Sequence, residues 1–444
     1  MKKWLSLFIA TVVAGLTTPA AAFCGFYVAQ ANAQLFNHAS KVVLARKDQQ
    51  TVVTMSSDYE GSPSSFAMVV PVPTVIRRDA VRVIDPGLIG RVDNYSAPRL
   101  VEYFDPDPCA PPIMYESAPA GAMEDIVVTS QKRSSANALG VRIEAQYQVG
   151  EYDILVLSAT QSNGLVTWLT QNGYKMPEGA APVVGSYLRQ NMKFFVAKVN
   201  LKRHAAQGAE TLRPLQITYT HRKFMLPIRL GTVNAKGPQE LFVYALTPNG
   251  RVETTNYRTV KLKSDLDIPV FVKSQFPRFY RSMFSKAVAQ QQMHAVFLEY
   301  AWDSSSCDPC ASEPLSSDEA KALGARWADD ESVFVTRLHL RYTRSTFPED
   351  LMLQETDDSE NFQARYVIRH TFKGPAKCAA GQEYRNGLVK RWDAEARNLA
   401  SLTGWGIPGI RDEMRKNGAR TSSLLDTGEP WYAALWDRVT ALFA

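Results

Sequence analysis

The sequence predicts an α+β fold made largely of antiparallel β-sheet, with several packed helices and two or three subdomains. Three observations lead to this prediction. Short β-prone runs follow one another closely, with polar or Gly-containing turns between several of them. Apolar residues recur at helical spacing in fewer places, chiefly toward the C-terminal end. The chain has 444 residues, which exceeds the size of one small domain.

Residues 1–22 have the features of a secretory signal peptide. Lys2 and Lys3 give a positive start, an uncharged apolar stretch follows, and small alanines precede Phe23. A membrane anchor is the alternative, but the apolar stretch is shorter than the roughly 20 residues that span a bilayer. We therefore predict cleavage between Ala22 and Phe23, and an exported protein that is periplasmic or extracellular.

Residues 23–105 form the first predicted segment of the mature chain, and it is rich in β-strands. Val42–Leu44 and Thr51–Met55 are β-prone runs separated by polar residues, which predicts a hairpin. Phe66–Val72 predicts a strand whose end lies at a sheet edge, because Pro71 has no amide hydrogen to donate to a neighbouring strand.

Residues 106–140 are rich in Pro, Ala, Ser and Gly, which predicts a linker or long loop. The central α+β segment, residues 141–265, contains one short helix that ends near Gly173. Its predicted strands are Ile154–Leu157, Phe194–Val199, Leu215–Tyr219, Phe224–Leu230, Leu241–Leu246 and Val252–Tyr257. Asn249-Gly250 lies between the last two, and this dipeptide is typical of a tight hairpin turn.

The C-terminal α+β segment, residues 266–444, alternates strands with helices. Strands are predicted at Ile268–Val272, Ala295–Trp302, Val333–Tyr342 and Arg365–Phe372. Helices are predicted from Phe276 to Val288, at Ser317–Leu323, and from Leu388 to a cap near Gly404. Trp431–Ala444 predicts a terminal amphipathic helix that docks on the domain. It is too short and too charged to span a membrane, so we expect no transmembrane anchor in the mature chain.

The charge balance and the motifs exclude several functions. The net charge of +6 falls to +4 when the two leader lysines are removed (6 − 2), which does not call for a nucleic-acid partner. The sequence contains no G-x-S-x-G, no S-x-x-K and no G-x-x-x-x-G-K. We therefore expect neither a serine hydrolase nor a nucleotide-binding protein, and the sequence indicates no cofactor.

Five cysteines are the candidate disulfide residues: Cys24, Cys109, Cys307, Cys310 and Cys378. In an oxidising compartment most of them are expected to pair, and the odd number leaves at least one unpaired within a chain. A bond from Cys24 to Cys109 would close a loop of about 85 residues and stabilise the fold by roughly 4–5 kcal/mol. The sequence does not fix the connectivity.

Cys307-x-x-Cys310 is the sharpest chemical feature. A Pro before the second cysteine and a β-type run upstream resemble a thioredoxin-type redox motif, with Cys307 as nucleophile and Cys310 as resolving thiol. However, the stretch Ala311-Ser312-Glu313-Pro314 stands where the helix of such a motif should begin. We therefore favour a structural disulfide, either within the pair or to Cys378.

A zinc site is a further alternative for the same cysteines. Zinc in proteins takes four ligands of the Cys and His type, and Cys307, Cys310, Cys378 and His370 would supply them. Export into an oxidising space disfavours free thiolates, so we expect no bound metal.

Basic residues gather on one face of two predicted strands. Arg337, His339 and Arg341 share a face, and so do Arg365 and Arg369. If the two strands pair, they form a basic patch for an acidic polymer or partner. The alternative, which we favour, is an ordinary exposed sheet face.

Several stretches resemble one family of exported bacterial proteins, the domain-of-unknown-function 2330 family. The matching stretches are Phe23–Ala29, Phe66–Pro73, Tyr300–Trp302 followed by Cys307–Cys310, Phe347–Leu351, Arg365–His370 and Leu402–Trp405. They span nearly the whole mature chain. The resemblance implies an exported bacterial protein and nothing about activity.

These observations predict an exported soluble protein of the periplasm or cell envelope that is stabilised by disulfides and acts by binding or as a structural component. We do not expect an enzyme. A thiol–disulfide oxidoreductase that uses Cys307 and Cys310 is the alternative. The partner stays open, with an envelope protein or a polymer as candidates.

Overall fold

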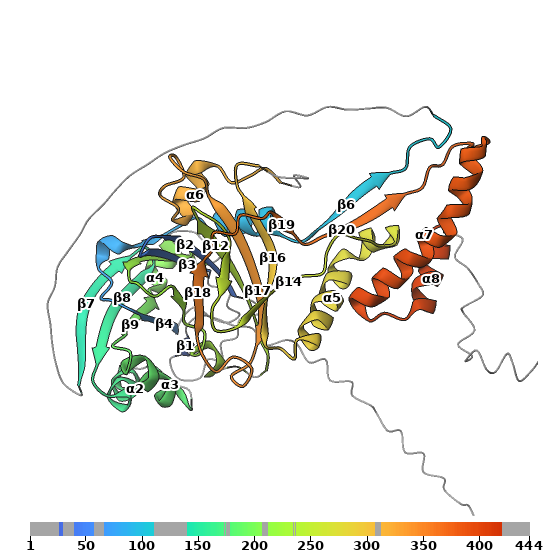
Figure 1. Cartoon of the computed structure of the whole chain (residues 1–444). Coiled ribbons are helices and arrows are strands. Elements are labelled where there is room, and N and C mark those ends of the chain that lie inside the picture. Colours follow the sequence, from blue (N-terminus) through green and yellow to red (C-terminus); the bar gives the residue numbers. More distant parts are fainter. Residues whose placement is uncertain are drawn as a thin grey trace, which may run out of the picture.

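The computed structural model has an α+β fold, as predicted (Figure 1). The described residues are 26–29, 40–56, 66–110, 140–172, 174, 178–206, 212–233, 235, 237–306 and 312–419. The predicted signal peptide, Cys24, Cys307, Cys310, most of the linker at 106–140, the Gly173 cap and the terminal helix at 431–444 lie outside these residues.

A large mixed sheet forms the centre of the molecule. Its order is β14-β16-β17-β12-β2-β3-β10-β5, with β19 beside β16. The strands are β2 (Ser40–Lys47), β3 (Gln50–Met55), β5 (Val81–Val83), β10 (Leu215–Thr220), β12 (Gln239–Thr247), β14 (Arg258–Lys261), β16 (Ala295–Asp303), β17 (Phe334–Tyr342) and β19 (Phe362–Gln363). The pairs β2–β12 and β14–β16 are parallel, and the other pairs are antiparallel. All three predicted segments contribute strands to this sheet.

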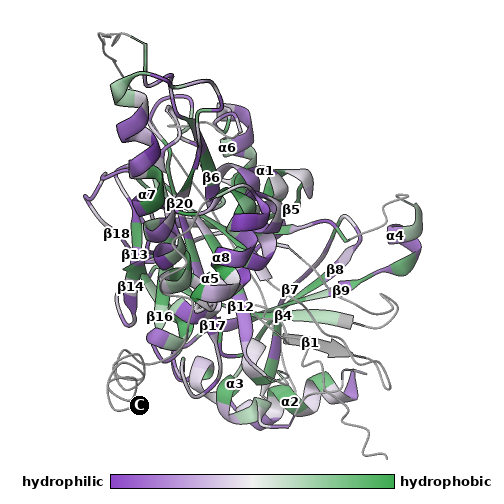
Figure 2. Ribbon diagram, turned by 90° about the vertical axis from the view of Figure 1, so that its right-hand side faces the viewer, coloured by the Kyte–Doolittle hydropathy of each residue, from purple (hydrophilic) through white to green (hydrophobic). Residues whose placement is uncertain are grey.

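A second, antiparallel sheet packs on one face of the large sheet. Its order is β1-β4-β9-β8-β7. The strands are β1 (Phe26–Ala29), β4 (Phe66–Val72), β7 (Val141–Val149), β8 (Tyr152–Ala159) and β9 (Lys193–Val199). One apolar core holds side chains of both sheets, such as Val42 and Leu338 from the large sheet and Val70 and Phe195 from the smaller one. Figure 2 shows hydrophobic residues along β4, β8 and β9.

Several of the helices cover the outer faces of the two sheets. The helices are α1 (Gly87–Ser96), α2 (Ser162–Gln171), α3 (Ala180–Leu188), α4 (Leu201–Ala206), α5 (Phe276–Gln290), α6 (Ser317–Leu323), α7 (Ala379–Thr403) and α8 (Ile407–Lys416). Helices α2 and α3 pack on the smaller sheet through Leu165 and Val184. Helices α1 and α6 pack on the outer face of the large sheet, and α5 packs further along the same face.

Two three-stranded sheets complete the fold. One has the order β11-β18-β13, and the other has the order β15-β20-β6. Their strands are β6 (Arg99–Phe104), β11 (Met225–Leu226), β13 (Val252–Thr254), β15 (Leu266–Asp267), β18 (Leu351–Glu355) and β20 (Arg365–His370). Strands β6 and β20 run in parallel away from the large sheet with α7 beside them, and we call this part the arm (Figure 1).

Several local predictions are confirmed. Strands β2 and β3 form the predicted hairpin, with Asp48 in the left-handed region of its turn. Helix α6 begins with a capping box between Ser316 and Glu319. Helix α7 ends at Gly404, whose φ of 76° suits glycine. Strand β4 has the predicted bounds, Phe66–Val72, and its Pro71 pairs with Phe194 of β9.

Two predictions are wrong. Asn249-Gly250 does not close a hairpin, because β12 pairs with β2 and β17 whereas β13 pairs with β18. Residues 268–272 are not a strand. They follow the two-residue strand β15 and enter the 3-10 helix η4 (Val270–Gln275), in which Val272 N donates to Pro269 O at 3.0 Å. Pro269 lacks an amide hydrogen and so cannot continue the β ladder.

Candidate functional site

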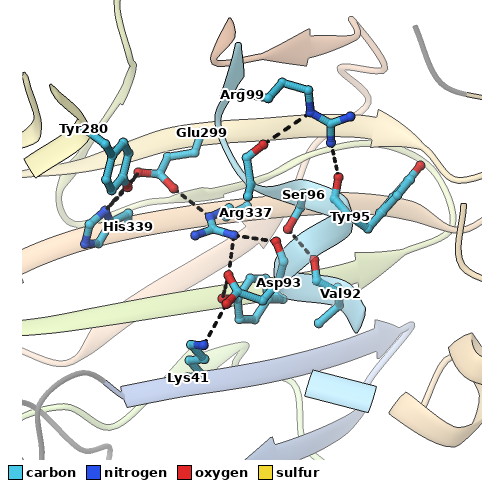
Figure 3. A network of polar contacts seen from close by, with 12 residues as sticks. Lys41, Val92, Asp93, Tyr95, Ser96, Arg99, Tyr280, Glu299, Arg337 and His339 are labelled. Atoms are coloured by element: carbon cyan, nitrogen blue, oxygen red, sulfur yellow. Dashed lines mark hydrogen bonds and ion pairs between the residues drawn. The ribbon is translucent and has the colours of Figure 1, made fainter. Parts of the chain in front are cut away.

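A cluster of charged side chains lies on the outer face of the large sheet, beneath α1 and α5. We call it the buried charged cluster, and its members are Asp93, Glu240, Glu299, Arg337, His339 and Arg341. It occupies the seam between the apolar core under α1 and α6 and the apolar core under α5. Figure 3 shows Arg337 at its centre, between Glu299 on one side and Asp93 on the other.

The backbone of β16 and β17 places three of these side chains together. Alternation along β17 puts Arg337 and His339 on one face. Phe297 pairs with His339, but Tyr300 rather than Glu299 pairs with Arg337. Glu299 is therefore the extra residue of a β-bulge, and the bulge leaves its carboxylate next to both basic side chains.

Glu299 is fully buried and both of its carboxylate oxygens are hydrogen-bonded. Arg337 Nε donates to Oε2 at 2.7 Å, and His339 Nδ1 lies 2.9 Å from Oε1. The Tyr280 hydroxyl of α5 donates to the same Oε1. Three donors from two elements thus converge on one buried carboxylate, which offsets the cost of removing its charge from water.

Arg337 links the sheet to helix α1. Its Nη1 donates to Asp93 Oδ1 at 2.6 Å and to the main-chain oxygen of Asp93 at 2.9 Å. The Asp93 carboxylate also accepts from Lys41 Nζ and from the Tyr244 hydroxyl, each at 2.7 Å. Arg337 therefore bridges Glu299 of β16 and Asp93 of α1 through hydrogen bonds assisted by charge.

Aromatic rings enclose His339. Its ring stacks on Phe284 with the centroids 3.6 Å apart, and on Phe242 with the centroids 4.0 Å apart. Its Nε2 has no hydrogen bond, and Glu240 Oε2 lies 3.6 Å from that nitrogen. Glu240 in turn forms an ion pair with Arg341.

The pKa values follow from burial opposed by these charges. Burial raises the pKa of Glu299, but the charges of His339 and Arg337 outweigh it and hold that pKa below its ordinary value. Burial lowers the pKa of His339, but Glu299 and Glu240 outweigh it, so the pKa of His339 is raised. The pKa of Glu240 falls to about 2 because His339 and Arg341 outweigh its burial. Each charged side chain in the cluster thus stabilises the ionised form of the oppositely charged side chain beside it.

Two interpretations of the predicted basic face were considered, a binding patch and an ordinary exposed sheet face, and both are wrong. Arg337 and His339 are buried and paired with carboxylates, so they form neither an accessible basic patch nor an exposed sheet face. Arg365 and Arg369 lie on β20 in a different sheet, where they pair with Asp265 at 2.5 Å and with Asp267 at 3.0 Å. The alternation along β17 is real, but a second layer covers its polar side.

Cys109 and Cys378 form a disulfide, with their Cα atoms 5.9 Å apart. Phe104 of β6 pairs with His370 of β20, and the two cysteines follow these residues in the chain. This strand pairing brings together two cysteines that are 269 positions apart. The Cys24–Cys109 bond and the bond from the Cys307/Cys310 motif to Cys378 are thereby excluded.

The hypothetical zinc site is also excluded in the form considered above. The disulfide occupies Cys378, and His370 Nε2 lies 2.8 Å from Glu102 Oε2 while its ring stacks on Phe104. Within the described residues, no group of three His, Cys, Asp or Glu side chains is placed to hold a metal ion. The same part of the chain contains no helix with the length and apolar character needed to cross a membrane.

A second polar group lies in the arm. Asp105 accepts from the Tyr384 hydroxyl at 2.6 Å and from Arg391 Nη1 at 2.7 Å. Glu395 is buried one turn further along α7, with its Oε1 3.5 Å from Arg391 Nε. Burial, together with the charges of Asp267 and Asp105, raises the pKa of Glu395 to about 8 against the opposing charge of Arg391.

The acidic half of the buried charged cluster was not predicted from the sequence. Asp93, Glu240 and Glu299 come from α1, β12 and β16, far apart in the chain. Glu299 lies on the predicted strand Ala295–Trp302, and Glu240 directly precedes the predicted strand Leu241–Leu246 at the same alternation as Phe242 and Tyr244. The bulge at Glu299 breaks the alternation that would have placed that carboxylate.

The comparisons with known proteins agree with the resemblance given above. Residues 18–354 match the family described as "Uncharacterized protein conserved in bacteria" (DUF2330). The match contains the whole buried charged cluster and ends before β20 and α7, so the stretches at 365–370 and 402–405 lie outside the matched residues. No curated protein and no solved structure matches the chain. Because the match covers well over half of its length, the chain belongs to the DUF2330 family of bacterial proteins.

Proposed function

We propose that this protein is exported to the periplasm or cell envelope and acts there by binding or as a structural component, without catalysing a reaction. The Cys109–Cys378 disulfide carries the proposal. Disulfides of this kind persist in oxidising compartments and are rare in the cytosol. The signal-peptide features of residues 1–22 point in the same direction.

The geometry of the buried charged cluster supports a structural role for the groups that resemble catalytic ones. Glu299, His339 and Tyr280 would be natural acid–base candidates. Both oxygens of Glu299 are taken up by its neighbours, and the His339 ring is enclosed between Phe284 and Phe242. The contacts of Arg337 and Tyr280 hold α1 and α5 on the large sheet.

Cell fractionation tests the proposal. The full chain is expressed in a bacterium, and the protein is recovered from each compartment for N-terminal sequencing and thiol mapping. We expect a protein that begins at Phe23, outside the cytoplasm, with Cys109 and Cys378 oxidised. The matched control is Leu7→Arg, which interrupts the apolar leader and should keep an unprocessed chain in the cytoplasm. Recovery of the unaltered chain in the cytoplasm, with its leader intact and both thiols reduced, would refute the proposal.

An insulin-reduction assay separates the binding protein from the thiol–disulfide oxidoreductase. A binding or structural protein has no such activity, whereas the oxidoreductase would lose it in a folded Cys307→Ser variant. The Cys24→Ser variant serves as the control, since it removes a cysteine but keeps the Cys307-x-x-Cys310 motif.

A further inference from the structure

The two sulfurs of the Cys109–Cys378 disulfide lie in different surroundings. Cys109 is exposed, in the turn that follows β6. Cys378 is half-buried at the N-cap of α7, a helix of 25 residues, and its Sγ accepts a hydrogen bond from Gly381 N at 3.2 Å. One sulfur therefore faces solvent, and the other lies at the positive end of a long helix.

Neighbouring charges add to this asymmetry. Asp107 lies beside Cys109, and its Oδ1 accepts from the Cys109 amide at 2.8 Å. Lys377 precedes Cys378, and the Arg385 guanidinium donates to the Ala376 carbonyl next to it. A negative charge at the first sulfur and positive charges at the second would favour a thiolate on Cys378 over a thiolate on Cys109.

We propose that the Cys109–Cys378 disulfide is a thiol-exchange site, with Cys109 as the sulfur that is attacked and Cys378 as the leaving group. The co-reactant is a dithiol, either a small molecule or a partner protein. Its thiolate forms a bond to Cys109 Sγ, the Cys109–Cys378 bond breaks, and the electron pair goes to Cys378 Sγ. The second thiol of the dithiol then displaces Cys109, so the dithiol is oxidised by two electrons and both cysteines are reduced.

The arm can pass through this reaction without unfolding. Strands β6 and β20 pair along their whole length, and Asp105 holds Tyr384 and Arg391 of α7 independently of the sulfurs. The disulfide is thus one of several links between the end of β6 and α7. This inference goes beyond the proposed function, which requires only that the disulfide forms.

The first test measures where a monothiol attacks. The oxidised full-length protein is treated with glutathione, the reaction is stopped with acid, and peptides are mapped by mass spectrometry. We expect glutathione on Cys109 in severalfold excess over Cys378. An equal distribution, an excess on Cys378, or a bond that resists a dithiol under native conditions would overturn the proposal.

The second test measures the leaving group in matched variants. Cys109→Ser leaves Cys378 as a free thiol, and Cys378→Ser leaves Cys109. Both are reduced and alkylated with iodoacetamide across a pH series, with the labelled peptides quantified and the fold checked by circular dichroism. We expect an alkylation midpoint of about 7 or lower for Cys378 and of about 8.5 or higher for Cys109. Equal midpoints near 8.5 would refute the assignment, and if a variant does not fold, the glutathione map of the unaltered protein still decides.

Discussion

Glu299 Oε2 and Arg337 Nε lie 2.7 Å apart between neighbouring strands, and both side chains are almost completely removed from solvent. The β-bulge at Glu299 makes this contact possible. The same arginine reaches Asp93, so one side chain joins the sheet to α1. The pair therefore helps to hold α1 on the large sheet, and its removal should lower the free energy of unfolding.

We expect Glu299→Gln to lower the free energy of unfolding by about 3–5 kcal/mol, since it leaves Arg337 and His339 buried without their counter-charge. Urea unfolding followed by circular dichroism measures this loss. Glu360→Gln is the matched control, because the Glu360 side chain is 66% exposed in its ion pair with Lys261. The control should change stability by about 1 kcal/mol or less. Similar losses in both variants would contradict the role assigned to Glu299.

His339 should make stability depend on pH. Its pKa is raised in the folded state by Glu299 and Glu240 against its burial, so its contribution is fully present below the unfolded pKa of about 6.5. That contribution is lost as the pH rises through the folded value. The stability advantage of the unaltered protein over His339→Gln should therefore shrink as the pH rises above about 6.5.

Denaturant unfolding at a series of pH values measures this difference. His294→Gln is the control, because His294 is exposed and its Nδ1 lies 2.6 Å from the Gln292 carbonyl oxygen, which carries no full charge. The control should run parallel to the unaltered protein. A stability difference for His339→Gln that stays constant with pH would contradict the prediction.

Glu395 should also make the stability of the fold decrease as the pH rises, but over a different pH range from His339. Its folded pKa of about 8 lies above the unfolded value of about 4.3, so the folded state binds more protons between these limits. Stability contributed by the protonated form is full below about 4.3 and is lost as the pH rises to about 8. Glu395→Gln should therefore be the more stable protein above pH 8, by about 1–3 kcal/mol.

Unfolding midpoints at pH 5 and pH 9 test this prediction. The variant should gain on the unaltered protein between the two values. Glu383→Gln, on an exposed part of the same helix, should show no such gain. A loss of stability in Glu395→Gln at pH 9 would show that the carboxylate is ionised and well paired in the folded protein.

Gly250 should not tolerate a side chain. A Cβ at this position would lie 2.5 Å from the Thr356 carbonyl oxygen and 2.7 Å from that of Asp358, and both are backbone atoms that cannot rotate away. We expect Gly250→Ala to cost about 1–3 kcal/mol of stability through this overpacking.

Gly387→Ala is the contrasting variant. This glycine lies in α7, and a Cβ added to it would meet no atom of another residue within 4 Å beyond its own helix backbone. Alanine should therefore stabilise the helix by about 0.5–1 kcal/mol. Thermal unfolding compares the two substitutions. Equal shifts of the midpoint would contradict the close approach described at Gly250.

Local signals in the sequence predicted much of the fold. The α+β class, the β2–β3 hairpin, the capped helix α6 and the end of α7 at Gly404 follow from alternation, capping and turn residues. The hairpin prediction at Asn249-Gly250 failed because this dipeptide indicates a tight turn but carries no information about which strand the next strand pairs with. In this protein the strand after Gly250 joins β18.

The candidate site was predicted only in part. Alternation correctly placed Arg337, His339 and Arg341 on one face of a strand. It carries no information about what covers that face, and here α1 and α5 bring Asp93 and Tyr280 onto it. Likewise, the cysteine spacings did not reveal the Cys109–Cys378 pairing, since that pairing depends on β6 and β20 lying side by side.

The parallel contact between β2 and β12 has a consequence for the order of events in folding. Val42 pairs with Val243, about 200 positions later, so the centre of the large sheet closes one long loop. Pairing between segments so far apart costs a large loop-closure entropy before the stabilising contacts form. This cost slows folding. On a ribosome, strand β2 finds its hairpin partner β3 at once, but more than half of the polypeptide must be made before its other neighbour, β12, exists.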